Sequence, residues 1–308
     1  MKLLSKQKCD DAQDTLRQRR ELLSQSVTSV VQGFTPSLFV WGPPGLGKTH
    51  ELTLLLDGLT GRRWKHHTAY ATPKGLMLAI AETPNGVHLF EDCESMLKTA
   101  LSASILRAAC GSPNDRDRIV TYETNAEKYA VKFTGGIIIA TNENLARASG
   151  PMQGVASRFR PVKWDMTAEE RIAMLMQISD MPHVKRGVTI TAHEARKVLT
   201  ELLSILDELG GDVPLDLRLF TEHALPAFAQ SKMDSKMKWQ DMLAAKLTGT
   251  AQTMQEGQAQ RTARLRTIAQ RIHMDGGTVK DRVKKWEELT GLGQAIYYRH
   301  VKGMRQGK

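Results

Sequence analysis

One stretch of the sequence combines glycine, lysine and threonine at a spacing suited to phosphate binding. Residues 42–49, Gly42-Pro43-Pro44-Gly45-Leu46-Gly47-Lys48-Thr49, fit the pattern G-x-x-x-x-G-K-[ST] without a mismatch. The glycines let backbone N–H groups surround a polyphosphate. Lys48 can reach the β- and γ-phosphates, and the Thr49 hydroxyl can ligate Mg²⁺. We therefore expect a site for a polyphosphate and Mg²⁺.

The residues around this loop predict the elements that must position it. Ser37–Trp41 is a short apolar run typical of a buried strand, and His50–Leu56 has the composition of a helix. A helix that starts at the loop adds the partial positive charge of its N-terminus to an anion site. The strand, the loop and the helix thus all favour a phosphate-binding loop. The alternative is a glycine-rich turn that matches the pattern by chance.

A second buried strand ends in acidic residues. Residues 86–94 read Gly-Val-His-Leu-Phe-Glu-Asp-Cys-Glu, so Glu91 and Asp92 follow an apolar run. A hydrolytic phosphate site needs one carboxylate near Mg²⁺ and another that positions the attacking water. Two adjacent acids at a strand end can supply both. The alternative is an acidic turn after a core strand.

With its phosphate loop and acidic strand, the chain resembles the AAA+ ATPase family. The usual order of the two acids in that family is Asp then Glu, whereas Glu91 precedes Asp92 here. By position the resemblance implies that Glu91 assists the metal and Asp92 orients water, with Glu94 as a further candidate. Because the order of the two acids is inverted, their separate roles stay open, and slow hydrolysis is compatible with the sequence.

The resemblance extends to three more polar residues. Gly135–Asn142 is an apolar run ending in Asn142, which would contact the γ-phosphate or the water. The Arg-Phe pair at Arg158 would supply a finger to the nucleotide of a neighbouring subunit, with Arg160 in reserve. Arg218 would be a lid residue that contacts the γ-phosphate. Surface or salt-bridge roles for these arginines remain the alternatives.

The resemblance covers about residues 35–230 and implies an α/β fold with a parallel sheet. It implies an αβα nucleotide-binding domain with a helical lid, ATP and Mg²⁺ as cofactors, and sites shared between subunits of a hexamer-like ring or helical oligomer. The apolar runs that alternate with helical segments also predict the parallel sheet. These runs are Ser37–Trp41, Lys65–Tyr70, Val87–Phe90 and Gly136–Ala140.

After residue 165 the pattern becomes helical. Thr167 and the acids after it predict a capped helix start. Glu194–Leu209 and Leu217–Phe228 have helical apolar spacing, and residues 248–260 indicate a linker or an exposed helix. We expect four segments: an N-terminal helical segment at 1–32, the ATPase domain at 33–165, the lid at 166–247 and a basic helical domain at 248–308.

Composition and charge narrow the class of protein. The chain has 308 residues, three cysteines and no apolar run of membrane-spanning length, so we expect an intracellular, cytoplasmic protein without a disulfide framework or a membrane partner. Of the formal net charge of +10, residues 230–308 hold 16 Lys/Arg against 7 Asp/Glu. A basic tail favours a polyanionic partner, most simply DNA. The alternative is a solvated surface.

A candidate DNA contact precedes the Asn142 strand. Residues 118–133 contain two alternating β-prone runs around Asn125-Ala126-Glu127, which predicts a hairpin. AAA+ branches that act on DNA carry a hairpin at this place, so Lys128 and Lys132 could touch phosphates. An ordinary edge hairpin is equally compatible. Residues 72–75 are a second, weaker candidate for a pore loop.

The C-terminal residues 283–301 resemble a helix-turn-helix, with Gly291 at the turn. Leu289, Leu292, Tyr297 and Val301 would pack the two helices together. A further helix from residues 261–273 would complete the unit. The candidate DNA-binding residues are Lys284, Lys285, Gln294, Tyr298, Arg299 and Lys302. The alternative is a basic helical hairpin that only packs on protein.

The sequence therefore predicts an oligomeric AAA+ ATPase that binds and hydrolyses Mg-ATP and remodels, loads onto or translocates DNA. Replication initiation, helicase loading and transposition are all compatible, and a replication or recombination protein is a possible partner. Two alternatives stay open. One is an ATPase that remodels protein, and the other is an ATP-switched DNA-binding scaffold with slow hydrolysis.

Overall fold

The computed structural model describes residues 1–59, 61–68, 72–93, 96–111, 118–124, 127–144, 153–209, 213–234, 238–290 and 292–302. Glu94, Gly291 and residues 125–126 of the predicted hairpin turn lie outside this set, as does the side chain of Lys302. The chain forms two compact units. One contains residues 2–200 and 215–229, and the other contains residue 1, residues 201–214 and residues 230–308.

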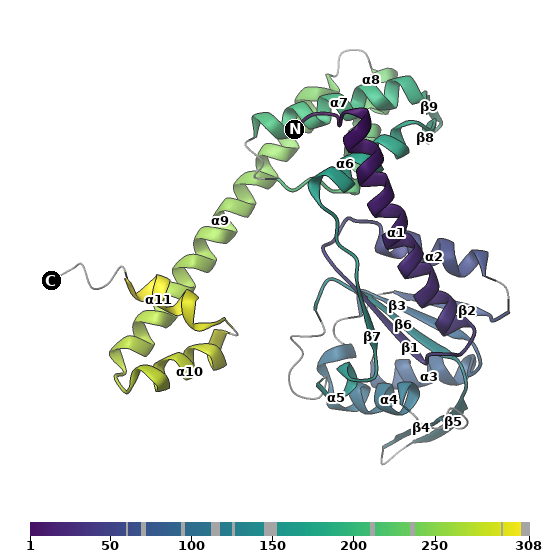
Figure 1. The fold of residues 1–308 in the computed structure, drawn as a ribbon, viewed down its shortest axis with the longest axis vertical. Coiled ribbons are helices and arrows are strands. Elements are labelled where there is room, and N and C mark those ends of the chain that lie inside the picture. The colour runs from purple at the N-terminus through teal and green to yellow at the C-terminus, as the bar shows by residue number, and fades with distance from the viewer. Residues whose placement is uncertain are drawn as a thin grey trace. The chain divides into compact units, whose positions relative to one another are not determined.

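The first unit contains a five-stranded parallel sheet, so the predicted α/β class is confirmed (Figure 1). The strand order is β2-β3-β6-β1-β7. Its strands are β1 (Ser37–Trp41), β2 (Trp64–Thr68), β3 (Val87–Glu91), β6 (Gly136–Thr141) and β7 (Arg160–Lys163). Four of these match the predicted apolar runs. The central strands β1, β3 and β6 are buried on both faces, which is why most of their residues are apolar.

The fifth strand, β7, is absent from the sequence prediction. It pairs with β1 at the edge of the sheet, with Phe39 in register with Pro161. Proline lacks a donor and is tolerated on an edge strand, but it argues against a strand when only the sequence is considered. The reserve candidate Arg160 is the first residue of this strand.

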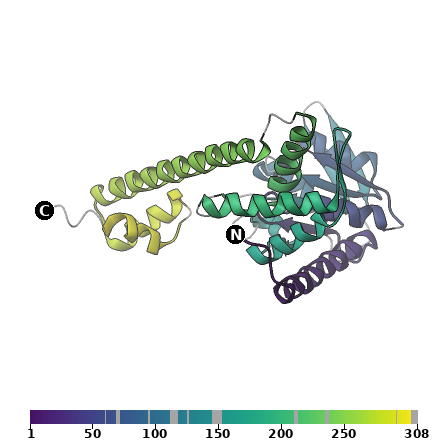
Figure 2. The ribbon, with the colours of Figure 1, turned by 90° about the horizontal axis from the view of Figure 1, so that it is seen from above.

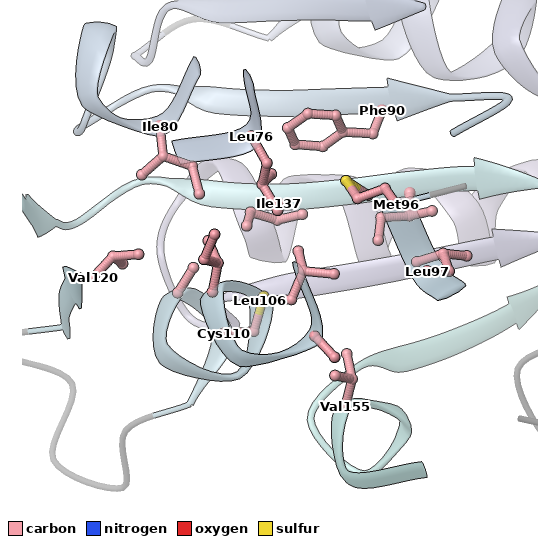
Figure 3. Packing of buried hydrophobic residues seen from close by; sticks show 14 of the residues in the cluster. Leu76, Ile80, Phe90, Met96, Leu97, Leu106, Cys110, Val120, Ile137 and Val155 are labelled. Atoms are coloured by element: carbon pink, nitrogen blue, oxygen red, sulfur yellow. The ribbon is translucent and has the colours of Figure 1, made fainter. Parts of the chain in front are cut away.

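Helices cover both faces of the sheet. Helices α1 (Lys6–Val31) and α2 (Lys48–Gly58) lie on one face in Figure 1, and α3 (Pro73–Glu82), α4 (Ala100–Cys110) and α5 (Gln153–Ala156) lie on the other. A short 3₁₀ turn, Met96–Lys98, precedes α4. Figure 3 shows Leu76 of α3 and Leu106 of α4 packed around Ile137 of β6.

The predicted hairpin is present. Strands β4 (Arg118–Glu123) and β5 (Lys128–Phe133) pair antiparallel, with Glu123 opposite Lys128. Val120 and Phe133 are buried in the same core as Ile137, so one face of the hairpin is anchored. Thr72, in the second candidate pore loop, caps α3, and Pro73 begins that helix.

The segments after the sheet are mostly helical. Helix α6 (Ala168–Ser179) begins at the predicted cap, where Thr167 and Glu170 form a capping box. A small hairpin follows, made of β8 (His183–Lys185) and β9 (Val188–Ile190). The remaining elements of this section are α7 (Ala192–Glu208), a π-helix (Leu219–Ala224) and α8 (Leu225–Met233).

Three helices form the C-terminal region. They are α9 (Trp239–Met274), α10 (Val279–Thr290) and α11 (Gln294–Lys302). Residues 248–260, predicted as a linker or exposed helix, lie inside α9. Figure 2 shows α10 and α11 against the C-terminal part of α9. No helix in the described part of the chain is long and apolar enough to cross a membrane.

Candidate functional site

The phosphate loop leaves β1 and enters α2 through left-handed glycines. Gly45 has φ +73° and Gly47, the N-cap of α2, has φ +74°, where any other residue would be strained. A Cβ on Gly42 would lie 1.8 Å from the Trp164 carbonyl oxygen. The Trp164 indole Nε1 donates to the Leu46 carbonyl at 2.8 Å. The loop is therefore held from one side by Trp164.

Lys48 lies folded back over the loop with its side chain largely buried. Its Nζ donates to the carbonyls of Gly42 and Pro43 at 2.9 and 2.8 Å, and to Asn142 Oδ1 at 2.9 Å. Lys48 comes from the loop and Asn142 from the end of β6, so parallel pairing of β1 and β6 brings them together. The structure places these two predicted site residues in direct contact.

Thr49 and Glu91 also meet. The Thr49 Oγ1 hydroxyl donates to Glu91 Oε1, and the other carboxylate oxygen of Glu91 lies 3.0 Å from His66 Nε2. A hydroxyl and a carboxylate are both ligands that Mg²⁺ prefers. The sequence analysis did not identify this contact of His66 with Glu91. Only the neighbouring positions of β2 and β3 bring it to Glu91.

Asp92 differs from Glu91 in its backbone. It has φ +50°, an unusual value for a residue other than glycine, and its side chain is exposed. Its N–H points to the Ala140 carbonyl at 3.4 Å. Strand β3 therefore ends with a sharp turn between the two acids, which lets them occupy different positions at the strand end.

Two histidines contact each other across β2 and β3, His67 on β2 and His88 on the acidic strand β3. His88 Nε2 is 2.9 Å from the Thr83 carbonyl, and His88 Nδ1 is 3.1 Å from His67 Nε2. Because a carbonyl only accepts, His88 donates from Nε2 and, when neutral, accepts at Nδ1. Burial lowers the pKa of His88 to about 4, and burial with the nearby Lys65 also lowers the pKa of His67.

A cavity of about 1150 Å³ opens above the phosphate loop. Parallel sheets bind ligands at the carboxyl ends of their strands, where this cavity lies. Its lining includes residues 44–49 of the loop, Glu91, Asp92, Asn142 and Arg218. Helix α1, which the sequence analysis predicted only as an N-terminal helical segment, contributes four further lining residues: Arg17, Arg20, Glu21 and Ser24.

Arg218 reaches this cavity from the segment before the π-helix. Its side chain is mostly exposed and lies 3.9 Å from Glu222. The neighbouring Asp216 accepts from the Leu219 N–H at 2.8 Å, and a Cβ on Gly45 would lie 2.5 Å from an Asp216 carboxylate oxygen. Burial raises the pKa of Asp216. The segment that contains Asp216 and Arg218 therefore packs against the phosphate loop.

The two candidate finger arginines lie elsewhere. Neither Arg158 nor Arg160 belongs to the described lining of the cavity, and both are exposed. Arg158 Nη1 donates to the Gly154 carbonyl at 2.6 Å. Neither residue thus contributes to the described wall of the cavity in its own chain.

The candidate DNA-binding lysines of the hairpin are exposed, and Lys128 pairs with Glu123 at 3.0 Å. Lys74 at the start of α3 binds Glu127 at 2.6 Å, and this hydrogen bond raises the pKa of Lys74. The hairpin and the start of α3, both candidate pore elements, are therefore linked by an ion pair.

In the C-terminal region Trp286, Tyr297 and Val301 are buried with Ala269 and Ile272 of α9. Residues 261–273 thus supply the further helix that the sequence analysis required. The prediction that Leu289 packs the helices was wrong, because its side chain is 61% exposed. Trp286, one turn earlier on α10, occupies the core. Leu289 is offset from Trp286 by about 60° around the helix axis and lies outside the core that Trp286 shares with Tyr297 and Val301.

Four of the candidate DNA-binding side chains in this region are exposed: Lys284, Gln294, Tyr298 and Arg299. Lys285 is also exposed but binds Asp275 at 2.7 Å. Gln294, Tyr298 and Arg299 all lie on α11. This region therefore presents a polar, basic helix surface around a small apolar core.

Comparison with known proteins found likenesses only among solved structures. No protein-family model and no curated protein matches the chain. One similar structure is a single-substitution variant of RuvB from Thermotoga maritima, at 17% identity and a TM-score of 0.36, which covers 64% of each chain. Another is NtrX from Brucella abortus in complex with ADP, at 14% identity and a TM-score of 0.44, covering 95% of this chain and 67% of that one. The fold assignment rests on the sheet itself.

Proposed function

We propose that this protein is an AAA+ ATPase that binds and hydrolyses Mg-ATP. The observation that carries the proposal is the meeting of Lys48 with Asn142 and of Thr49 with Glu91 at the carboxyl edge of a parallel sheet. In a bound state Lys48 would exchange its carbonyl partners for the β- and γ-phosphates. Thr49 and Glu91 would hold Mg²⁺, with Asp92 beside them to orient water.

The loop N–H groups and the N-terminus of α2 supply the rest of the anion site. Gly47 caps α2, so the partial positive charge of the helix points into the cavity. Asn142 is close enough to Lys48 to be a ligand of the γ-phosphate or of the attacking water. Arg218 lines the same cavity and is the candidate lid residue. Arg158 lies outside it, which suits a residue that acts on a neighbouring subunit's nucleotide.

The direct test measures binding of Mg-ATP and Mg-ADP to the full chain by isothermal titration calorimetry. We expect wild type to bind and Lys48→Ala to lose at least about tenfold in affinity, since a charged hydrogen bond contributes roughly 1.5–3 kcal/mol. Lys8→Ala, an exposed charge on α1, is the matched control. Wild-type protein that retains no nucleotide would refute the proposal.

Hydrolysis is tested separately through the two acids. We expect Glu91→Gln and Asp92→Asn to lower phosphate release, with Glu91→Gln also raising the Mg²⁺ concentration required. The contact of Glu91 with both Thr49 and His66 favours a metal role for this carboxylate. If wild-type turnover is negligible and neither variant lowers it, an ATP-switched scaffold is the better description.

We further propose that the oligomeric protein acts on DNA, with α11 as the base- and phosphate-contacting helix. The exposed Gln294, Tyr298 and Arg299 on one short helix, and the 16 Lys/Arg against 7 Asp/Glu after residue 229, support this. We expect duplex affinity to fall steeply with salt and Arg299→Ala to weaken it. Lys285→Ala should lower duplex affinity less than Arg299→Ala does, because Lys285 is paired with Asp275. If DNA does not change the ATPase rate but a protein does, an ATPase that remodels protein is the better description.

A further inference from the structure

Two consecutive arginines of α1 each hold a buried glutamate from a different helix. Arg20 donates from Nε and Nη2 to Glu51 Oε1 at 2.9 and 2.7 Å. Arg19 Nη2 donates to Glu170 Oε1 at 2.9 Å. The Glu51 and Glu170 side chains are only 8% and 3% exposed. Loss of either arginine would leave a buried carboxylate without its charged partner, which is strongly destabilising, so both pairs tie α1 to the helices that carry the glutamates.

The two glutamates stand at the starts of α2 and α6. Glu51 lies in the first turn of α2, two residues after Thr49. Glu170 closes the capping box of α6, where its other oxygen accepts from the Thr167 N–H at 2.6 Å. Helix α6 contributes Met174 and Ile178 to the wall of the cavity above the phosphate loop. Helix α1 is therefore tied to both the phosphate-loop helix and a cavity wall.

We propose that Arg20 is a positioning residue of the nucleotide site and that it acts through Glu51. The ion pair sets the position of the first turn of α2, which carries Lys48 and Thr49, while the Arg19–Glu170 pair fixes α6. Nucleotide affinity then depends on a helix that lies outside the phosphate-loop motif. The inference rests on the proposed function, because it assigns a role in the same site.

Arg20 also lines the cavity, so a direct contact between its guanidinium and a phosphate is the competing explanation. The variant Glu51→Gln separates the two. If Arg20 acts through Glu51, this variant weakens nucleotide binding as Arg20→Ala does. If Arg20 binds phosphate directly, Glu51→Gln releases the guanidinium, and affinity stays the same or rises.

The experiment titrates Mg-ADP into the full chain by calorimetry. ADP has no γ-phosphate, so binding is measured without hydrolysis. We expect Arg20→Ala and Glu51→Gln each to raise Kd by about tenfold, by analogy with residues that orient ligands of a site. The double variant should bind no more weakly than Arg20→Ala alone, because both changes break one contact. Arg20→Lys should be intermediate, since lysine keeps the charge but loses the forked geometry. Lys8→Ala should match wild type.

Thermal unfolding without nucleotide separates positioning from folding. A merely structural role lowers the unfolding midpoint and leaves Kd unchanged in the molecules that remain folded. If Arg20→Ala does not fold, Glu51→Gln and Arg20→Lys carry the test, since neither leaves an unpaired buried carboxylate. Glu51→Gln with wild-type or tighter affinity overturns the inference. Wild-type protein that does not bind Mg-ADP refutes the proposed function instead.

Discussion

Acidification should destabilise the sheet through His88. This side chain is fully buried on β3, three residues before Glu91, and burial lowers its pKa from 6.5 to about 4. The unfolded chain therefore binds a proton near pH 6.5 while the folded chain resists protonation until about pH 4. Stability from this group is complete above pH 6.5 and falls as the pH decreases through this window.

The size of the effect follows from the two pKa values. The linkage relation gives a loss of about 2 kcal/mol at pH 5 and about 3 kcal/mol at pH 4, relative to pH 7. Protonation would also leave Nδ1 as a second donor facing His67, whose present contact requires Nδ1 to accept. Acid should thus loosen the strand that carries Glu91.

The assay is urea unfolding followed by circular dichroism at pH 7, 6 and 5, for wild type and His88→Phe. The variant should be less stable at pH 7, because it loses two hydrogen bonds. The difference between the two proteins should shrink by about 2 kcal/mol at pH 5, since only wild type carries the buried imidazole. His193→Asn, at an exposed histidine of α7, is the control. A difference that stays constant from pH 7 to 5 refutes the reasoning.

Three further predictions concern packing and helix propensity. Trp286→Ala should destabilise the α9–α11 region by about 3–5 kcal/mol, because it empties the centre of its core, whereas Leu289→Ala should change stability by less than about 0.5 kcal/mol. Methyl NMR signals of this region would report the loss, and equal effects of the two variants would contradict it. Gly42→Ala should abolish nucleotide binding and lower the thermal midpoint, since its Cβ would lie 1.8 Å from the Trp164 carbonyl oxygen. Gly257→Ala, with nothing within 4 Å of the added Cβ, should stabilise α9 by up to about 1 kcal/mol, and a destabilised Gly257→Ala would count against the helix.

The sequence predicted most of the sheet because its central strands are buried on both faces. Strand β1 has the predicted bounds, Ser37–Trp41. Strands β3 and β6 end at Glu91 and Thr141, each one residue later than predicted. The hairpin and the Thr167 cap were also predictable, since alternation and capping are local signals. Strand β7 was not, because Pro161 is acceptable only at a sheet edge, and the edge is known only when the strand order is known.

The candidate site also has features that were predictable from the sequence and features that depend on the tertiary structure. The types and spacing of residues 42–49, Glu91 and Asn142 were enough to predict a phosphate and metal site, because a loop that wraps a polyphosphate has few local solutions. Their meeting across β1, β3 and β6, and the contact of His66 with Glu91, depend on strand neighbours far apart in the sequence.

The amino-acid sequence by itself determined the loop, the buried strands and the basic C-terminal charge, since each depends on residues close together along the chain. Only the tertiary structure decided that α1 forms a wall of the cavity and that Arg19 and Arg20 hold Glu170 and Glu51. These pairs join residues 151 and 31 positions apart. No local periodicity reports such a contact, because a charged residue on a helix is usually solvated and finds a buried partner only through packing.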